Sequence, residues 1–193
     1  MFKKVGIIGI DINGNTRTRS NSLAAYKLWR SMLSRCYDTY KRKYYNYIDC
    51  TVCEEWHNFQ NFAKWYENNY YKIEGIMMNL DKDILIKGNK VYNPETCMFV
   101  PQNVNVLFTK SNKIRGLYPI GVSLYRGNKY KSTCSDGKGK SLNLGYFITI
   151  DDAFDRYKSY KEKLIKDIAN GYKDKIPTKL YDAMMEYTVD IKD

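Results

Sequence analysis

The feature that most constrains the fold is a set of three short strand patterns in the last third of the chain. Each has the alternation of a half-buried strand, and the intervening segments are rich in Gly, Asn and Asp. The three strand patterns are Gly121–Tyr125, Lys129–Ser135 and Ser141–Phe147, with turns predicted at Arg126–Asn128 and Asp136–Lys140. We therefore expect a three-stranded antiparallel sheet here.

A long amphipathic helix pattern follows directly. Thr149–Asp152 has the spacing of a capping box. The apolar positions recur at helical spacing through Ala153, Phe154, Tyr157, Leu164 and Ile168, with the stem of Lys161 at the edge. A helix with this single stripe covers one face of the sheet and leaves open the face that carries Lys and Arg.

The chain is strongly basic, with a net charge of +11 and a pI near 9.3. Residues 1–112 hold 16 Lys/Arg and 10 Asp/Glu, residues 113–168 hold 12 and 6, and residues 169–193 hold 4 and 5. We predict three parts with these bounds, the last a helical tail that starts near Pro177 and is either packed on the body or a homodimer contact. The charge favours a polyanion as partner, DNA or RNA first and a membrane surface second.

The excess charge in the middle part lies among the strand patterns. A phosphate-binding surface is the preferred interpretation, and a solvated face is the alternative. The predicted DNA contacts are Arg115, Arg126, Lys129, Lys131, Lys138 and Lys140. Arg126 is the residue expected to read a guanine.

The start of the chain has no secretory or membrane signal. No apolar run approaches 18 residues, and Asp11 comes too soon for the core of a signal peptide. Five Cys is an odd number, which argues against a disulfide framework. We expect a cytoplasmic protein.

The first 112 residues read as mixed α and β. Helical spacing of apolar residues predicts helices over Leu23–Tyr37 and Trp56–Tyr66. Short apolar runs predict strands at Leu80–Leu85 and around Val91 and Phe99, with a turn at Lys87–Lys90. A further helix is expected over Gln102–Thr109, so the fold class is α+β.

Cys50 and Cys53 have the two-residue gap typical of a zinc knuckle. Cys36 and Cys97 could supply the other two ligands of a structural zinc site. The alternative is that all four thiols are buried as small apolar groups.

Two sets of segments follow the pattern of a known family. The C-terminal set is Tyr118–Ser123, Lys129–Lys131, Leu144–Phe147 and Asp151–Tyr157. The N-terminal set is Tyr26–Tyr37, Val52–Trp56, Leu80–Leu85, Gly88–Tyr92 and Pro94–Pro101. Together they resemble the phage and mobile-element HNH endonucleases that carry an AP-two (ethylene-response-factor type) DNA-binding domain. The resemblance implies an HNH-like (ββα-metal-like) module in residues 1–112, an AP-two-like sheet and helix in residues 113–168, duplex DNA as partner, and a phage protein in the cytoplasm of a bacterial host.

The resemblance also implies a catalytic site for metal-dependent phosphodiester hydrolysis. Asp81 takes the position of a metal ligand, Lys82 that of the general-base His, Thr96 that of the bracing Asn, and Asn105 that of the last ligand of Mg²⁺ or Mn²⁺. Lys82 departs from the pattern, because an ammonium with an ordinary pKa near 10.4 is a poor base at neutral pH. The single His of the chain, His57, is distant in sequence from Asp81.

Three functions therefore stand open. The first is a DNA-binding protein of this type, an endonuclease if Asp81, Lys82 and Asn105 are active. The second is a non-catalytic repressor, or a decoy that binds a host defence protein, which Lys82 and Thr96 favour. The third is RNA binding.

Overall fold

The computed structural model describes residues 20–38, 47–109 and 117–193 of the chain. Contacts divide it into two compact units, one up to Phe99 and one from Val100 onward. The fold is α+β, as predicted. In the described ranges no helix combines the length and apolar character needed to cross a membrane.

The first unit contains two helices that pack on an aromatic core. Helix α1 (Ser20–Tyr37) and helix α2 (Phe59–Asn69) confirm the two predicted helices. The predicted start of the second at Trp56 is three residues early, because Glu54–His57 forms the 3-10 helix η2 and the Asn58 side chain then caps α2 by accepting from the Gln60 N–H. Trp56 is fully buried, and its carbonyl oxygen accepts a 2.7 Å hydrogen bond from Trp29 Nε1.

Four short strands between Thr51 and Pro101 form two small sheets. Strand β1 (Thr51–Val52) pairs in parallel with β3 (Val91–Tyr92), and β2 (Met78–Asp81) pairs with β4 (Met98–Pro101). The prediction of a strand over Leu80–Leu85 is wrong beyond Asp81. There the Asp81 carboxylate accepts the N–H groups of the next residues and bends the chain into a turn.

The second unit confirms the predicted three-stranded sheet. Its strands are β5 (Val122–Tyr125), β6 (Lys129–Ser135) and β7 (Ser141–Phe147), all antiparallel in the order β5-β6-β7. The first turn is the 3-10 helix η4 (Arg126–Asn128), and a register shift between Ser132 and Thr133 marks a bulge against β7. The other elements are helices α3 (Gln102–Phe108), α4 (Ile150–Tyr172) and α5 (Thr178–Glu186).

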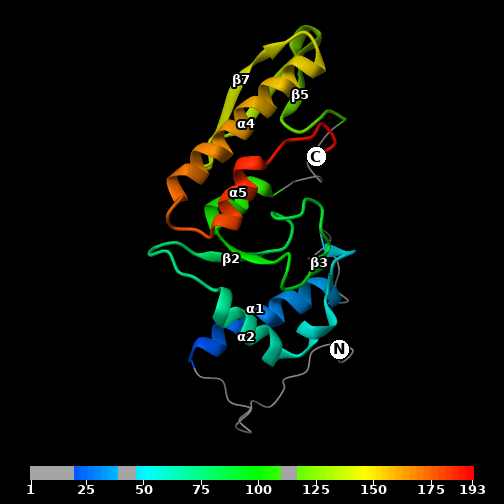
Figure 1. Ribbon diagram of the computed structural model, residues 1–193. Coiled ribbons are helices and arrows are strands. Elements are labelled where there is room, and N and C mark those ends of the chain that lie inside the picture. Colours follow the sequence, from blue (N-terminus) through cyan, green and yellow to red (C-terminus); the bar gives the residue numbers. More distant parts are fainter. Residues whose placement is uncertain (1–19, 39–46, 110–116) are drawn as a thin grey trace. The chain divides into compact units, whose positions relative to one another are not determined.

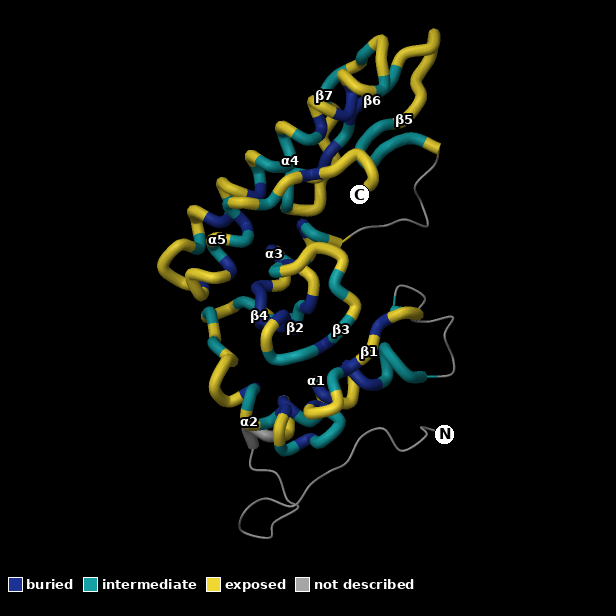
Figure 2. The backbone as a smooth tube through the Cα atoms, turned by 45° about the vertical axis from the view of Figure 1, so that its right-hand side comes forward, coloured by how far each residue is buried: buried dark blue, intermediate teal, exposed yellow. Residues whose placement is uncertain are grey.

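Helix α4 lies along one face of this sheet (Figure 1). It begins where the Thr149 hydroxyl accepts the Asp152 N–H, as the capping-box spacing predicts. Ala153, Phe154 and Tyr157 are buried against the sheet, and Figure 2 shows buried and exposed positions alternating along the helix. The packing is close at Gly121, where an added Cβ would overlap the Tyr157 ring.

Candidate nucleic-acid interface

Alternate residues of β6 face opposite sides of the sheet. Ser132 and Cys134 are buried on the side that α4 covers. The side chains of Lys129, Lys131 and Thr133 therefore belong to the opposite side, which we call the outer face. The two lysines predicted to contact DNA in this strand share that face.

The strand pairing places two tyrosines on the outer face beside these lysines. Tyr125 of β5 is paired with Lys129, and Tyr146 of β7 is paired with Lys131. Polar side chains with hydrogen-bonding groups complete the outer face, and they are Ser123, Thr133, Ser135, Ser141 and Asn143. The outer face thus has an aromatic and basic part and a small polar part.

The rings of Tyr125 and Tyr146 contact each other although their strands are not neighbours. Their centroids are 4.4 Å apart at an interplanar angle of 40°. A hydrogen bond with Tyr146 raises the pKa of Tyr125 above its ordinary value. Because the strands flank β6, the rings meet over β6, between Lys129 and Lys131.

The remaining predicted DNA contacts lie in the two turns of the sheet. Arg126 is exposed in η4 at one end, and Lys138 and Lys140 are exposed in the turn between β6 and β7 at the other end. Arg115 lies outside the described residues. The five described cations are thus spread along the sheet rather than gathered at one point.

The sheet is basic while α4 is electrically balanced. Residues 117–148 contain five Lys/Arg and one acidic residue, Asp136. The Asp136 carboxylate accepts the backbone N–H groups of Lys138 and Lys140 at 2.7 and 3.0 Å, which lowers its pKa. Helix α4 holds five basic and five acidic residues, so between residues 117 and 172 the excess positive charge lies in the sheet and its turns.

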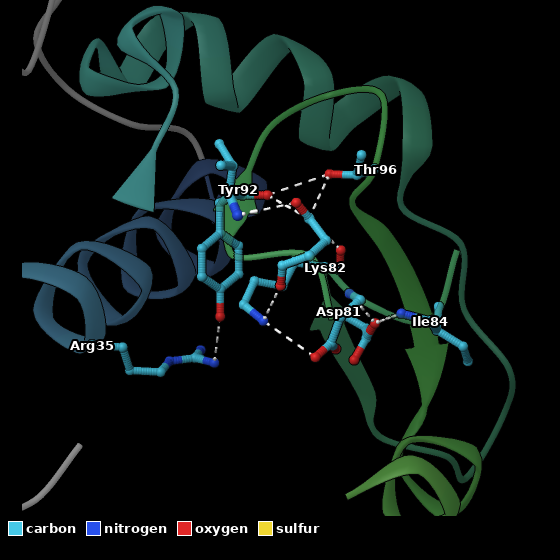
Figure 3. Close-up of polar contacts among 9 residues, drawn as sticks. Arg35, Asp81, Lys82, Ile84, Tyr92 and Thr96 are labelled. Carbon is cyan, nitrogen blue, oxygen red and sulfur yellow. Dashed lines mark hydrogen bonds and ion pairs between the residues drawn. The ribbon is translucent and has the colours of Figure 1, made fainter. Parts of the chain in front are cut away.

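Lys82, predicted at the position of a catalytic base, is buried, with 7% of its surface exposed. Its ammonium donates to the Asn89 carbonyl oxygen at 2.9 Å and to Asp83 Oδ2 at 3.3 Å, and it lies 5.8 Å from the centre of the Tyr92 ring. Figure 3 shows Lys82 and Arg35 both directed toward Tyr92, whose hydroxyl accepts a bond from Arg35. These contacts hold the Lys82 side chain within its own loop.

Asp81, predicted as a metal ligand, forms the turn that ends β2. Its Oδ1 accepts the N–H groups of Asp83 and Ile84 at 2.9 and 2.7 Å (Figure 3). Burial and the nearby Asp83 carboxylate raise the pKa of Asp81 to about 6. The Asp81 side chain therefore stabilises its own turn through these hydrogen bonds.

These residues do not fit a Mg²⁺ or Mn²⁺ site. The Lys82 ammonium next to Asp81 would repel a divalent cation, and in the described ranges no three His, Cys, Asp or Glu side chains are grouped to hold one. Asn105, the other predicted ligand, is in α3 of the second unit, and its carbonyl oxygen accepts the Thr109 hydroxyl at 3.2 Å.

The four thiols predicted as zinc ligands are packed in the first unit. Cys50 and Cys97 are buried, while Cys36 and Cys53 are half-buried. Burial raises the pKa of each thiol, to about 12 for Cys36. No metal-binding group that includes them occurs in the part of the chain that the structure describes.

His57 and Thr96 also have local structural partners. The His57 Nε2 lies 3.3 Å from the Tyr37 hydroxyl, which in turn contacts the backbone of Val52. Thr96 is buried and bonded to the side chains of Asn93 and Asn89. Sequence reasoning missed Asn89, whose amide donates to three oxygens, because no pattern distinguishes it from a turn residue.

Comparisons with protein families, with curated proteins and with solved structures find no match for this chain. The resemblance to HNH endonucleases with an AP-two domain therefore stays a prediction.

Proposed function

We propose that this protein binds duplex DNA through the outer face of the β5-β6-β7 sheet and does not cleave it. The observation that carries the proposal is the placement of Lys129 and Lys131 on the face opposite α4, with further cations in both turns. Phosphate contacts of this kind supply most of the affinity of proteins for nucleic acid.

The dimensions of the sheet support a position in the major groove. Strand β6 has seven residues, so it is about 20 Å long at roughly 3.3 Å per residue. The major groove is about 12 Å wide. A sheet of this length reaches both sugar-phosphate backbones, with Arg126 at one end and Lys138 and Lys140 at the other.

The surroundings of Lys82 support a function in DNA binding without hydrolysis. At the position where the resemblance implies a histidine base, the chain has a buried lysine whose Nζ donates to the Asn89 carbonyl oxygen and to Asp83. The observation also favours the non-catalytic function among those the sequence leaves open.

The binding proposal is tested by measuring the affinity of the full chain for a random 30-base-pair duplex across a salt series. The double variant Lys129→Gln/Lys131→Gln should bind more weakly and reduce the slope of log K against log salt by about 2, since each phosphate contact contributes roughly 0.9. The control is Lys163→Gln/Lys166→Gln, which removes two exposed charges from α4. Equal losses in both double variants, or an affinity that salt does not change, would contradict the proposal.

The absence of cleavage is tested separately with supercoiled plasmid in the presence of Mg²⁺ or Mn²⁺. We expect no nicking by the full chain at concentrations that saturate the plasmid. Nicking that is lost in Asp81→Ala would restore the endonuclease hypothesis. This result would not contradict the proposed DNA-binding surface on the sheet.

A further inference from the structure

Two half-exposed aromatic rings stand at the centre of the proposed DNA-binding face. Tyr125 is 42% exposed and Tyr146 is 45% exposed. An aromatic pair that is left open in the middle of a basic surface usually marks the contact with a partner.

The pair is held in place by its own contacts. The ring centroids are 4.4 Å apart, and the interaction between the two side chains raises the pKa of Tyr125. Part of one face of each ring is therefore covered by the other ring. This leaves less free ring face for stacking an unpaired base, while the outward edges form an apolar surface with Lys129 and Lys131 on either side.

A duplex offers one apolar group in the major groove that matches such a surface. The C5-methyl group of thymine projects into the groove, and apolar side chains contact it in sequence-specific complexes. With the sheet in the groove, the two lysines next to the rings are positioned for the phosphates or for the acceptor atoms of adjacent bases.

We propose that the Tyr125–Tyr146 pair recognises thymine, through its methyl group, at one position or two adjacent positions of the DNA site. This inference rests on the proposed function, because it requires the outer face to lie in the major groove. It adds a specificity determinant to a surface whose cations alone would not distinguish one sequence from another.

The experiment starts from the full chain and a random duplex pool, from which bound sequences are selected. In the selected site each thymine is then replaced by deoxyuridine, which removes only the C5-methyl group and keeps base pairing. We expect about fourfold weaker binding at one position or two neighbouring positions, the effect of exposing one buried methyl group. The same substitutions should have no effect on the double variant Tyr125→Ala/Tyr146→Ala.

Two control variants keep the result interpretable. Tyr125→Phe/Tyr146→Phe keeps the rings and should retain the preference for thymine over deoxyuridine. Ile86→Ala removes an exposed apolar side chain from the first unit and should retain it as well. The deoxyuridine series on the unchanged chain does not depend on the folding of any variant.

The outcomes separate this inference from the proposed function. Duplex binding in which no deoxyuridine substitution has an effect would overturn thymine recognition and leave DNA binding standing. An effect that persists in the double alanine variant would also overturn it, because the methyl group would then contact another residue. Preference for single-stranded DNA, or no binding to duplex DNA, would overturn both.

Discussion

Lys82 and Asn89 bind each other through two reciprocal hydrogen bonds. The Lys82 ammonium donates to the Asn89 carbonyl oxygen at 2.9 Å, and the Asn89 amide donates to the Lys82 carbonyl oxygen at 2.6 Å. The same amide also donates to the Val91 carbonyl oxygen and the Thr96 hydroxyl. The two residues thus close the loop between β2 and β3.

Asn89→Ala should destabilise the protein by about 2–3 kcal/mol. The substitution leaves partly buried carbonyl oxygens without their donor, and an unsatisfied buried group costs about 1–3 kcal/mol. Urea unfolding of the full chain measures the change. Asn61→Ala is the control, since the exposed Asn61 amide donates only to the Glu55 carbonyl oxygen, and its loss should cost less than about 1 kcal/mol.

Gly121→Ala should be among the most damaging single substitutions in the second unit. Its φ of +79° is a conformation that L side chains rarely adopt, and the new Cβ would overlap the Tyr157 ring beneath the sheet. We expect a loss of about 3 kcal/mol or more in the free energy of unfolding, within the range for overpacked positions. The loss is measured by thermal unfolding, followed by near-UV circular dichroism, which reports on the surroundings of the tyrosines.

Gly171→Ala is the matched control for that substitution. Gly171 is within α4, and an added Cβ there would meet no atom within 4 Å. Because Ala favours helix over Gly, the variant should be neutral or up to about 1 kcal/mol more stable. A destabilised Gly171→Ala together with a tolerated Gly121→Ala would show that the packing of α4 on the sheet is described wrongly.

The sheet and α4 could be predicted from the sequence because their signals are local. The turns at Arg126–Asn128 and Asp136–Lys140 fix the pairing of adjacent strands, and residue alternation then determines which side each side chain faces. Lys129 and Lys131 could be assigned to one face on that basis. The contact between Tyr125 and Tyr146 could not, because it crosses a whole strand.

The first unit was less predictable because its pairings are not local. Strand β1 pairs with β3 about 40 residues later, a choice that no turn in the sequence specifies. The sequence also shows a lysine, Lys82, where the resemblance implies a histidine base. It did not show that the side chain is buried with Asn89 and Tyr92 as partners, since only the folded loop brings these groups together.

Thr149→Ala should destabilise the second unit by about 1 kcal/mol, the usual cost of removing a helix N-cap. The Thr149 hydroxyl accepts the Asp152 N–H at 3.1 Å and contacts the Asp152 carboxylate at 2.6 Å. Thr149→Ser keeps the hydroxyl and should retain most of the stability, as measured by thermal unfolding. An equal loss in both variants would mean that the methyl group, and not the cap, is what stabilises α4.

Asp81→Asn should stabilise the protein near pH 7.5 and have little effect near pH 4. Folding raises the pKa of Asp81 to about 6, from an ordinary value near 3.9. The folded state therefore binds this proton more tightly, and proton binding stabilises it below pH 4. This stabilisation is lost as the pH rises through 6. Asn is neutral throughout, and its Oδ1 can still accept the N–H groups of Asp83 and Ile84.

The quantity to measure is the difference in unfolding free energy between Asp81→Asn and the unchanged chain, from urea titrations at several pH values between 4 and 8. The difference should grow with pH up to about 7 and then level off, and it should not exceed about 3 kcal/mol, the limit set by a shift of about two pKa units. Titrating groups that do not interact with Asp81 cancel in this difference, since both proteins contain them. A variant that is less stable than the unchanged chain at pH 7.5 would mean that the ionised carboxylate is required, as a metal ligand or an ion-pair partner of Lys82 would be. Asp81 would then regain a functional role that its place in the turn argues against.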